Sequence, residues 1–218
     1  MATEKLYLWS RDMRGEARIT ALLDGEKKIV RLARTLFHPQ GGGQRADQGT
    51  IAGRPVLDVR HAPEDEVDHV VASLDGLNVG ETVPLNVDAV RRHLHARLHS
   101  AGHLIADAGA LVAPGLHGKA GHHWPNEARV EFDGQVSDIP AFTAALDAKL
   151  RDLIARDLPV AVARDAQDTR GVTICGAAVP CGGTHVAHLG EIEAITIRRV
   201  QQKGGGVRVS YAVAGESG

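Results

Sequence analysis

The sequence is poor in aromatic residues, since 3 Phe, 2 Tyr and 2 Trp make up only 3% of its 218 positions. So few rings exclude a broad stacking platform for the bases of a nucleic acid. The net charge is −2, so no general excess of positive charge draws the chain to a polyanion, and any such partner must meet a local basic patch. No apolar run is long enough to span a membrane, which excludes a transmembrane helix.

Cysteine is equally scarce. The chain contains only Cys175 and Cys181, which excludes a scaffold built on many disulfides. Met1–Asp12 lacks the apolar stretch of a secretory signal peptide, so we expect a soluble protein of the cytoplasm, where thiols stay reduced. Cys175 has apolar neighbours and is interpreted as a core residue, whereas Cys181 is followed by two glycines in a setting typical of a ligand.

The hydrophobic pattern changes near residue 85, and we predict two domains, 1–85 and 86–218. With 43% hydrophobic residues, the chain can bury one large core or two small ones. In the first part, short apolar segments alternate with Gly, Asp and Pro, which is typical of short strands in a small barrel-like unit. The predicted strands are Lys5–Trp9, Ala17–Leu23, Lys28–Leu36, Gly49–Ile51, Pro55–Val59 and Asp68–Ala72.

The second part mixes helical and strand patterns, so the predicted fold class is α+β. Asp138-Ile139-Pro140 is a helix start, because Asp can cap the helix and Pro fits its first turn. Strands are predicted at Ala128–Phe132 and Pro159–Ala163, followed by a hairpin of Glu191–Gln201 and Val207–Val213.

A long helix carries the first candidate ligands. Asp88 is suited to cap a helix that continues to Ala113 without a proline. Its apolar stripe contains Val90, Leu94, Leu98, Ala101, Leu104, Ile105, Ala108, Leu111 and Val112. His95, His99 and His103 lie one turn apart on the other side, so two neighbours can chelate one ion. The spacing leaves both pairs open, His95/His99 and His99/His103, and it also fits the solvated face of an amphipathic helix.

A second fragment offers complementary ligands. Cys181-Gly-Gly-Thr-His185 places a thiol and an imidazole four residues apart on a loop that glycine allows to turn tightly. A plain glycine-rich turn with a buried thiol gives the same pattern. Together with the histidine helix, however, the fragment completes a set of three imidazoles and one thiolate, which suits Zn²⁺.

A third feature is the glycine loop Phe37–Gln44, with the sequence FHPQGGGQ, followed by Asp47 and Gly49. Three successive glycines cost backbone entropy and indicate a sharp turn or a close approach to another group. The loop lacks the Lys-Ser/Thr ending of a phosphate-binding P-loop. On physical grounds alone it is an ordinary flexible turn, and a ligand role is the alternative.

Four motifs occur together over nearly the whole chain: Thr35–Gln44 with Asp47 and Gly49, His99-x3-His103, Cys181-Gly-Gly-Thr-His185, and Gly190-Glu-Ile192 before the Lys-Gly-Gly-Gly hairpin. In this order they resemble the AlaX family, the free-standing homologues of the alanyl-tRNA synthetase editing domain. That domain is also similar to the editing domain of threonyl-tRNA synthetase.

The resemblance implies a small N-terminal β-barrel-like domain followed by an α/β two-layer editing domain. It also implies a trans-editing hydrolase, which removes serine or glycine wrongly attached to tRNA(Ala). The expected partner is the acceptor end of tRNA(Ala), the expected cofactor is Zn²⁺, and no membrane partner is expected. We expect a monomer.

The resemblance also assigns residues. His99, His103 and Cys181 become zinc ligands, with His185 as fourth ligand or near neighbour. All four are the expected catalytic residues, and His95 stays outside the site. The implied substrate-binding residues are Gly41, Gly42, Gly43, Gln44, Gly182, Gly183 and Thr184. Zinc can then activate water or polarise the carbonyl, or it can anchor the substrate while backbone amides of Gly182-Gly183 stabilise the oxyanion.

The chain departs from the family pattern at the substrate pocket. Gly102 stands where the synthetase editing domain commonly has Thr, and no Gln occurs at 117–122, so the amino acid removed does not follow from the resemblance. His122 and His123 beside Trp124 fit a pocket wall or a surface loop. Two other functions fit the same residues: a zinc-stabilised tRNA-binding module without catalysis, and a metal hydrolase for a small ester or amide.

Overall fold

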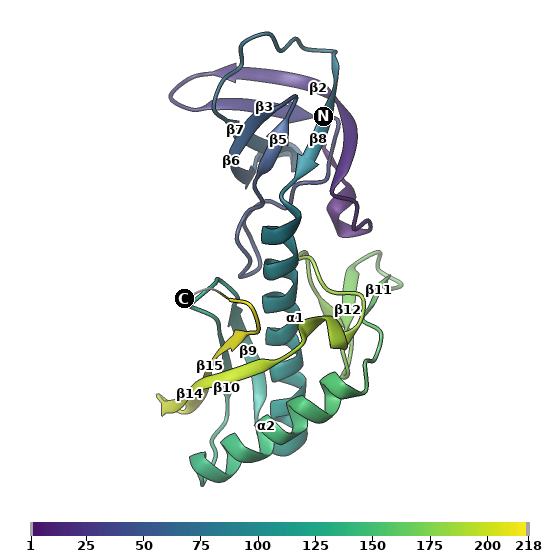
Figure 1. The fold of residues 1–218 in the computed structure, drawn as a ribbon. Coiled ribbons are helices and arrows are strands. Elements are labelled where there is room, and N and C mark those ends of the chain that lie inside the picture. The colour runs from purple at the N-terminus through teal and green to yellow at the C-terminus, as the bar shows by residue number, and fades with distance from the viewer. Residues whose placement is uncertain (1, 217–218) are drawn as a thin grey trace. The chain divides into compact units, whose positions relative to one another are not determined.

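The computed structural model describes residues 2–216 and divides the chain into two compact units (Figure 1). The first unit runs to Gly41 and resumes over Arg45–His93. The second contains Gly42–Gln44 and the chain from Leu94 onward. Part of the glycine loop, Gly42–Gln44, therefore belongs to the second unit, which also contains all four predicted metal ligands.

The first unit is a closed six-stranded barrel, which confirms the predicted barrel-like domain. Neighbouring strands are antiparallel, and β8 closes the barrel by pairing with both β2 and β5. Alternate residues of β8 are buried and exposed, which is the pattern of a strand with one face in the core. Around the barrel the strands are β2 (Arg14–Asp24), β3 (Lys28–Leu32), β7 (Val67–Val71), β6 (Arg54–His61), β5 (Gly49–Ile51) and β8 (Thr82–Val87).

The strand predicted at Lys5–Trp9 is wrong. Only Glu4–Lys5 (β1) is extended, and it pairs with β4 (Arg34–Thr35), while Leu6–Leu8 (η1) forms a 3₁₀ turn. The backbone N–H groups of Trp9 and Ser10 both donate to the carbonyl of Leu6 and close this turn. A second 3₁₀ turn, η2, covers Pro63–Asp65.

The ends of the glycine loop are held inside the first unit by a buried ion pair. Asp47, which is fully buried, accepts a hydrogen bond from the backbone N–H of His38 at 2.6 Å. Its carboxylate also accepts from Nε of Arg92 at 3.1 and 3.0 Å, and Arg92 donates to the carbonyl of Leu36 at 2.6 Å. This network explains why an Asp follows the glycines, because a buried carboxylate needs paired donors.

The barrel also contains two buried histidines with lowered pKa values. Nδ1 of His69 lies 3.0 Å from the carbonyl of Val30, so it carries the proton, and Nε2 accepts from the hydroxyl of Thr35 at 2.7 Å. Burial lowers the pKa of His69 to about 4, and burial with the nearby Arg92 lowers that of His38 to about 4 despite the opposing charge of Asp47. Both rings are therefore neutral at pH 7.

These histidines predict a loss of stability in acid. A histidine in the unfolded chain has a pKa near 6.5, so its neutral folded form contributes fully above that pH and loses its contribution as the pH falls from about 6.5 to about 4. For His69 the integrated loss is about 3 kcal/mol. We expect urea unfolding of the barrel between pH 7.5 and 4.5 to depend less steeply on pH in His69→Gln than in the wild type. Equal pH slopes for the two proteins would contradict the assignment, whatever their absolute stabilities.

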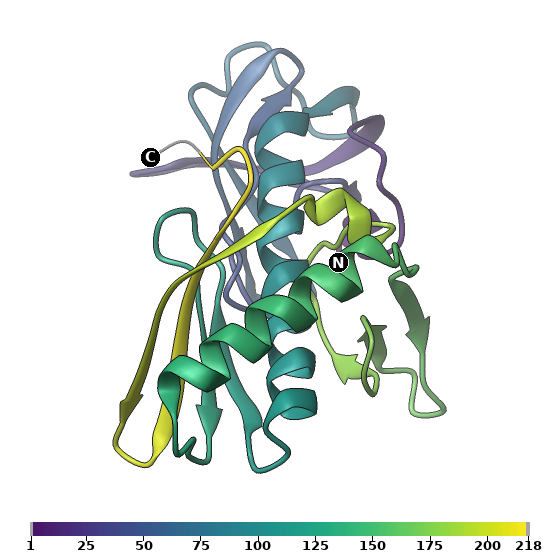
Figure 2. The same ribbon diagram turned by 60° about the horizontal axis from the view of Figure 1, so that its bottom comes forward.

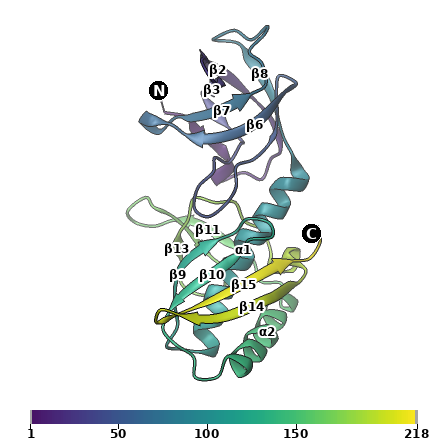
Figure 3. The same ribbon diagram turned by 90° about the vertical axis from the view of Figure 1, so that its left-hand side faces the viewer.

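The second unit is built on a four-stranded antiparallel sheet in the order β14-β15-β10-β9. These strands are β14 (Ile195–Lys203), β15 (Gly206–Val213), β10 (Arg129–Asp133) and β9 (His117–His122). The β14–β15 hairpin forms one edge (Figure 2), and the helices α1 (Ala89–Val112) and α2 (Ile139–Ala155) lie behind the sheet in Figure 3. Residues from both helices and the sheet share one core, which confirms the α+β class.

The start of α1 agrees with its sequence signal. Asp88 accepts a hydrogen bond from the backbone N–H of Arg91 at 3.1 Å, as an N-cap does. The middle of the predicted stripe is fully buried, but Val90 and Leu111 are 82% and 58% exposed, so the prediction was wrong at both ends of the helix. Among the residues the structure describes, neither α1 nor any other helix has the length and apolarity needed to cross a membrane.

The helix predicted at Asp138 is also present. The Asp138 side chain accepts from the backbone N–H of Ala141 at 2.9 Å, and the residues buried on α2 are Phe142, Leu146, Leu150 and Leu153. A small separate sheet contains β11 (Ala161–Arg164), β12 (Arg170–Thr173) and β13 (Val179–Pro180). The start of the predicted strand Glu191–Gln201 is wrong, because Leu189–Ile192 forms the 3₁₀ turn η3 before β14 begins.

Candidate metal centre

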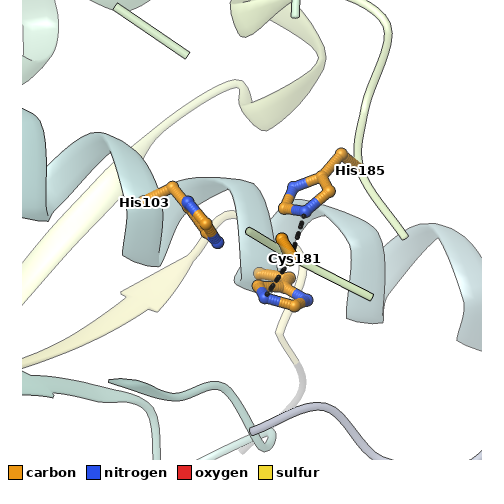
Figure 4. Close-up of side chains that lie close together, drawn as sticks. His103, Cys181 and His185 are labelled. Carbon is orange, nitrogen blue, oxygen red and sulfur yellow. Dashed lines mark hydrogen bonds between the residues drawn. The ribbon is translucent and has the colours of Figure 1, made fainter. Parts of the chain in front are cut away.

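The two predicted ligand fragments meet at one point of the second unit. One ligand atom from each of His99, His103, Cys181 and His185 lies within 4.8 Å of the other three. Helix α1 supplies the first two residues and the loop after β13 supplies the others (Figure 4). Sγ of Cys181 lies 3.5 Å from Nε2 of His99 and 3.3 Å from Nε2 of His185. His95 is buried but does not belong to this group.

The hydrogen bonds of Gln44 fix the orientation of His99. The backbone N–H of Thr184 donates to Oε1 of Gln44 at 3.0 Å, and Nε2 of Gln44 donates to the hydroxyl of Thr184 at 2.8 Å. Nδ1 of His99 lies 2.8 Å from the same Oε1, which can only accept. Nδ1 of His99 therefore carries the proton, and the lone pair on Nε2 faces Cys181.

His185 is oriented in the same way by a different partner. Its Nδ1 lies 3.1 Å from Oγ of Ser100, a buried side chain on α1 that also accepts from the backbone N–H of Val186 at 3.2 Å. With the proton on Nδ1, the lone pair of Nε2 again faces the thiol. Polar partners that hold the outer ring nitrogen are characteristic of metal-ligating histidines.

Burial controls the protonation of the ligands. Burial lowers the pKa of His103, and the nearby carboxylate of Asp107 opposes this effect in part. The lowered pKa favours the neutral imidazole, which can offer a nitrogen lone pair to a metal ion. Burial also raises the pKa of the Cys181 thiol, while the backbone N–H of Gly183 and the positive charge of Arg170 partly lower it. A bound cation would favour the thiolate further, because metal binding and deprotonation of the ligand are coupled.

The four residues fit a zinc-type ion by the chemistry of their donors. Nδ1 of His99 and Nδ1 of His185 are both turned outward, to Gln44 and Ser100 respectively. Their Nε2 atoms meet a soft thiol at one point, which is the donor set and the orientation that a tetrahedral zinc site requires. The described residues hold this arrangement through hydrogen bonds that do not involve the ion.

The glycines of the two loops have different surroundings. A Cβ placed on Gly183 would lie well under 3.0 Å from Cε1 and Nδ1 of His99, so only glycine lets this loop approach the ring. Gly43 has φ +76°, and a Cβ there would lie 2.5 Å from the carbonyl oxygen of Gly121. A Cβ on Gly42 or Gly182 would meet no atom within 4 Å. The structure thus brings Gly43, Gln44, Gly183 and Thr184 to the histidines, and Gly41 belongs to the barrel unit.

Sequence reasoning did not assign positioning roles to Gln44 and Ser100, and it left His123 undecided between a pocket wall and a loop. His123 is buried at the end of β9, and its ring stacks on that of His99 with the centroids 4.6 Å apart. Burial lowers its pKa to about 3. The two glycines near it, Gly102 and Gly121, were the available sequence signal, because a Cβ at either position would overlap its ring.

In the second unit the pair His99/His103 and the pair Cys181/His185 converge at one point beside an α+β core. Residues 170–208 match the family described as the threonyl and alanyl tRNA synthetase second additional domain. The matched segment contains β12, two of the four ligands and β14.

Curated relatives extend the match to the whole chain. The alanyl-tRNA editing protein AlaX-M of Methanosarcina barkeri is 32% identical over 96% of this chain and 98% of its own length. The corresponding protein of Methanosarcina mazei is 28% identical over 96% of this chain and 95% of its own length. The alanine–tRNA ligase of Bifidobacterium longum is 30% identical over 93% of this chain, which spans 26% of that enzyme. The chain belongs to the AlaX family of alanyl-tRNA editing proteins.

Proposed function

We propose that this protein is a free-standing, zinc-dependent deacylase that hydrolyses the ester bond of tRNA(Ala) carrying serine or glycine. The observation that carries the proposal is the convergence of one ligand atom from each of four residues, His99, His103, Cys181 and His185, within 4.8 Å. The names of the relatives, which are alanyl-tRNA editing proteins and alanine–tRNA ligases, support the choice of substrate.

The four residues would hold zinc, which when bound would act as a Lewis acid that polarises a carbonyl group or a water molecule. Ester hydrolysis also needs donors for the negative charge that develops on the carbonyl oxygen. The backbone N–H of Gly183 lies 3.4 Å from Sγ of Cys181, and that of Thr184 is used by Gln44. The N–H of Gly182 donates to none of the described residues and is the amide of this loop that is available as an oxyanion donor.

A second candidate function follows from the same geometry. If all four residues bind the metal, the site is tetrahedral and closed, as structural zinc sites are. Zinc would then hold the loop of Cys181 on α1, and the protein would bind tRNA without hydrolysing it. Binding of charged tRNA with no release of the amino acid distinguishes this function from the deacylase.

The deacylase predicts metal-dependent release of the amino acid. Purified tRNA(Ala) charged separately with serine, glycine or alanine is incubated with the protein as isolated, after chelation, and after return of zinc. We expect release of serine or glycine while alanine is spared, loss of that activity on chelation, and its recovery with zinc. Circular dichroism at each step shows whether the chelated protein stays folded. If folded, zinc-loaded protein releases none of the three amino acids, the proposal is wrong.

A further inference from the structure

His123 is held rigidly from two directions. The hydroxyl of Tyr211 lies 2.8 Å from the carbonyl of Leu98, to which it donates, and 2.7 Å from Nδ1 of His123. Its single proton is used on the carbonyl, so the hydroxyl accepts from Nδ1–H of the imidazole. The backbone N–H of His123 donates to the carbonyl of Gly43 at 2.8 Å. Both the ring and the backbone are therefore fixed, and Tyr211 itself is fully buried.

Three glycines surround this ring, and each comes from a different segment. A Cβ on Gly102 of α1 would lie well under 3.0 Å from Cε1 and Nδ1 of His123, and 2.8 Å from the hydroxyl of Tyr211. A Cβ on Gly121 of β9 would overlap Nε2, and one on Gly43 would lie 3.2 Å from Cδ2. Glycine inside a helix or a strand destabilises that element. At Gly102 and Gly121 the absence of a side chain leaves room for the imidazole of His123.

The ring lies at the metal centre without belonging to it. Its plane is 23° from that of His99, with the centroids 4.6 Å apart, and the ring centroid of His103 is 6.5 Å away. Because Nδ1 carries the proton, Nε2 of the neutral ring has a free lone pair. No described residue donates a hydrogen bond to this nitrogen. Unlike Nδ1 of His38, which is buried without a partner, Nε2 of His123 keeps some exposed surface.

We propose that His123 binds the substrate, accepting through Nε2 a hydrogen bond from a donor group on the aminoacyl moiety. The three glycines and Tyr211 position this acceptor beside the candidate metal ligands. Two donors of an aminoacyl ester have the required chemistry, the side-chain hydroxyl of a seryl group and the α-ammonium that every aminoacyl group carries. This inference takes its class of substrate, an aminoacyl ester, from the proposed function. It adds His123, which is not a metal ligand, as a residue that determines substrate affinity or specificity.

Two conservative variants separate the two nitrogens of the ring. In His123→Asn the amide can still donate to Tyr211, but it does not reach the position of Nε2. In His123→Gln the amide oxygen reaches that position and can accept from the substrate. The probes are non-hydrolysable adenosine analogues with seryl, glycyl or alanyl groups linked by a 3′-amide, titrated by calorimetry into zinc-loaded protein. We expect His123→Asn to bind at least about tenfold more weakly, as loss of one hydrogen bond from a hydroxyl or an ammonium group predicts, and His123→Gln to recover most of the affinity.

The three analogues identify the donor. A loss in His123→Asn confined to the seryl analogue assigns the hydroxyl, and an equal loss for all three assigns the α-ammonium. Wild-type affinity in His123→Asn, equal weakening in the two variants, or no binding of any analogue to the wild type would overturn the inference. Thermal melting and zinc stoichiometry of each variant show that the fold and the metal centre are intact.

The same proteins separate this inference from the proposed function. If the wild type binds the analogues through His123 but leaves charged tRNA intact, the deacylase is wrong and the binding role stands. If charged tRNA is hydrolysed equally by the wild type and His123→Asn, and both bind the analogues alike, the deacylase stands and the role of His123 is wrong.

Discussion

Replacing Gly183 by alanine is expected to displace His99 and to lower both zinc affinity and deacylation by about a hundredfold or more. An added Cβ would lie well under 3.0 Å from two ring atoms of His99 and 2.9 Å from Oε1 of Gln44. The ring is buried and hydrogen-bonded to Gln44, so it cannot yield without leaving its position as a ligand. Competition with a fluorescent zinc chelator measures the affinity, and the tRNA(Ala) assay measures the activity.

The neighbouring glycine provides the matched control. A Cβ on Gly182 would meet nothing within 4 Å, and neither Gly182 nor Gly183 has a positive φ, so alanine is allowed by the backbone at both positions. Gly182→Ala should bind zinc as the wild type does. Similar zinc affinity in Gly183→Ala and Gly182→Ala would contradict the close approach of this loop to His99. Because the two variants differ by one position, a general effect of stiffening the loop would affect both.

The fold was predictable where one face of an element is buried. In β8 every second residue enters the barrel, and in α2 a cap and an inward face mark the helix, so local patterns were sufficient. Strand β9 gave no such signal, since five of its six residues are exposed and it contains two glycines. The 3₁₀ turns at Leu6–Leu8 and Leu189–Ile192 are apolar enough to imitate strands. Their backbone closure depends on hydrogen bonds over three or four residues that composition does not reveal.

The metal centre was predictable as a set of residue types but not as a buried site. The spacing in α1 left two histidine pairs open and also fitted a solvated face. His99 is in fact 2% exposed, because Gln44 and the loop of Cys181 cover it. Gln44 and Thr184 are 140 positions apart, and no local pattern relates them. The sequence therefore indicated which side chains can bind zinc, and only the tertiary structure shows what holds them in place.

Gln44 is expected to control zinc affinity although it is not a ligand. In Gln44→Leu the hydrogen bonds to His99 and Thr184 are lost, so the imidazole can rotate and either ring nitrogen can carry the proton. Loss of a partner that orients a metal-ligating histidine typically costs about 10- to 100-fold in metal affinity. The chelator competition should show this loss, and the visible spectrum of the Co²⁺-loaded protein should change because the ligand geometry is less well fixed.

Gln44→Glu separates this positioning role from simple packing. A carboxylate can accept from Nδ1 of His99, from the backbone N–H of Thr184 and from the Thr184 hydroxyl after that hydroxyl rotates. It also makes the imidazole more basic, as carboxylates do when paired with zinc-bound histidines. We therefore expect zinc affinity and the Co²⁺ spectrum of Gln44→Glu to stay close to those of the wild type. If Glu lowers the affinity as much as Leu does, the amide of Gln44 serves the packing of the loop and does not set the tautomer of His99.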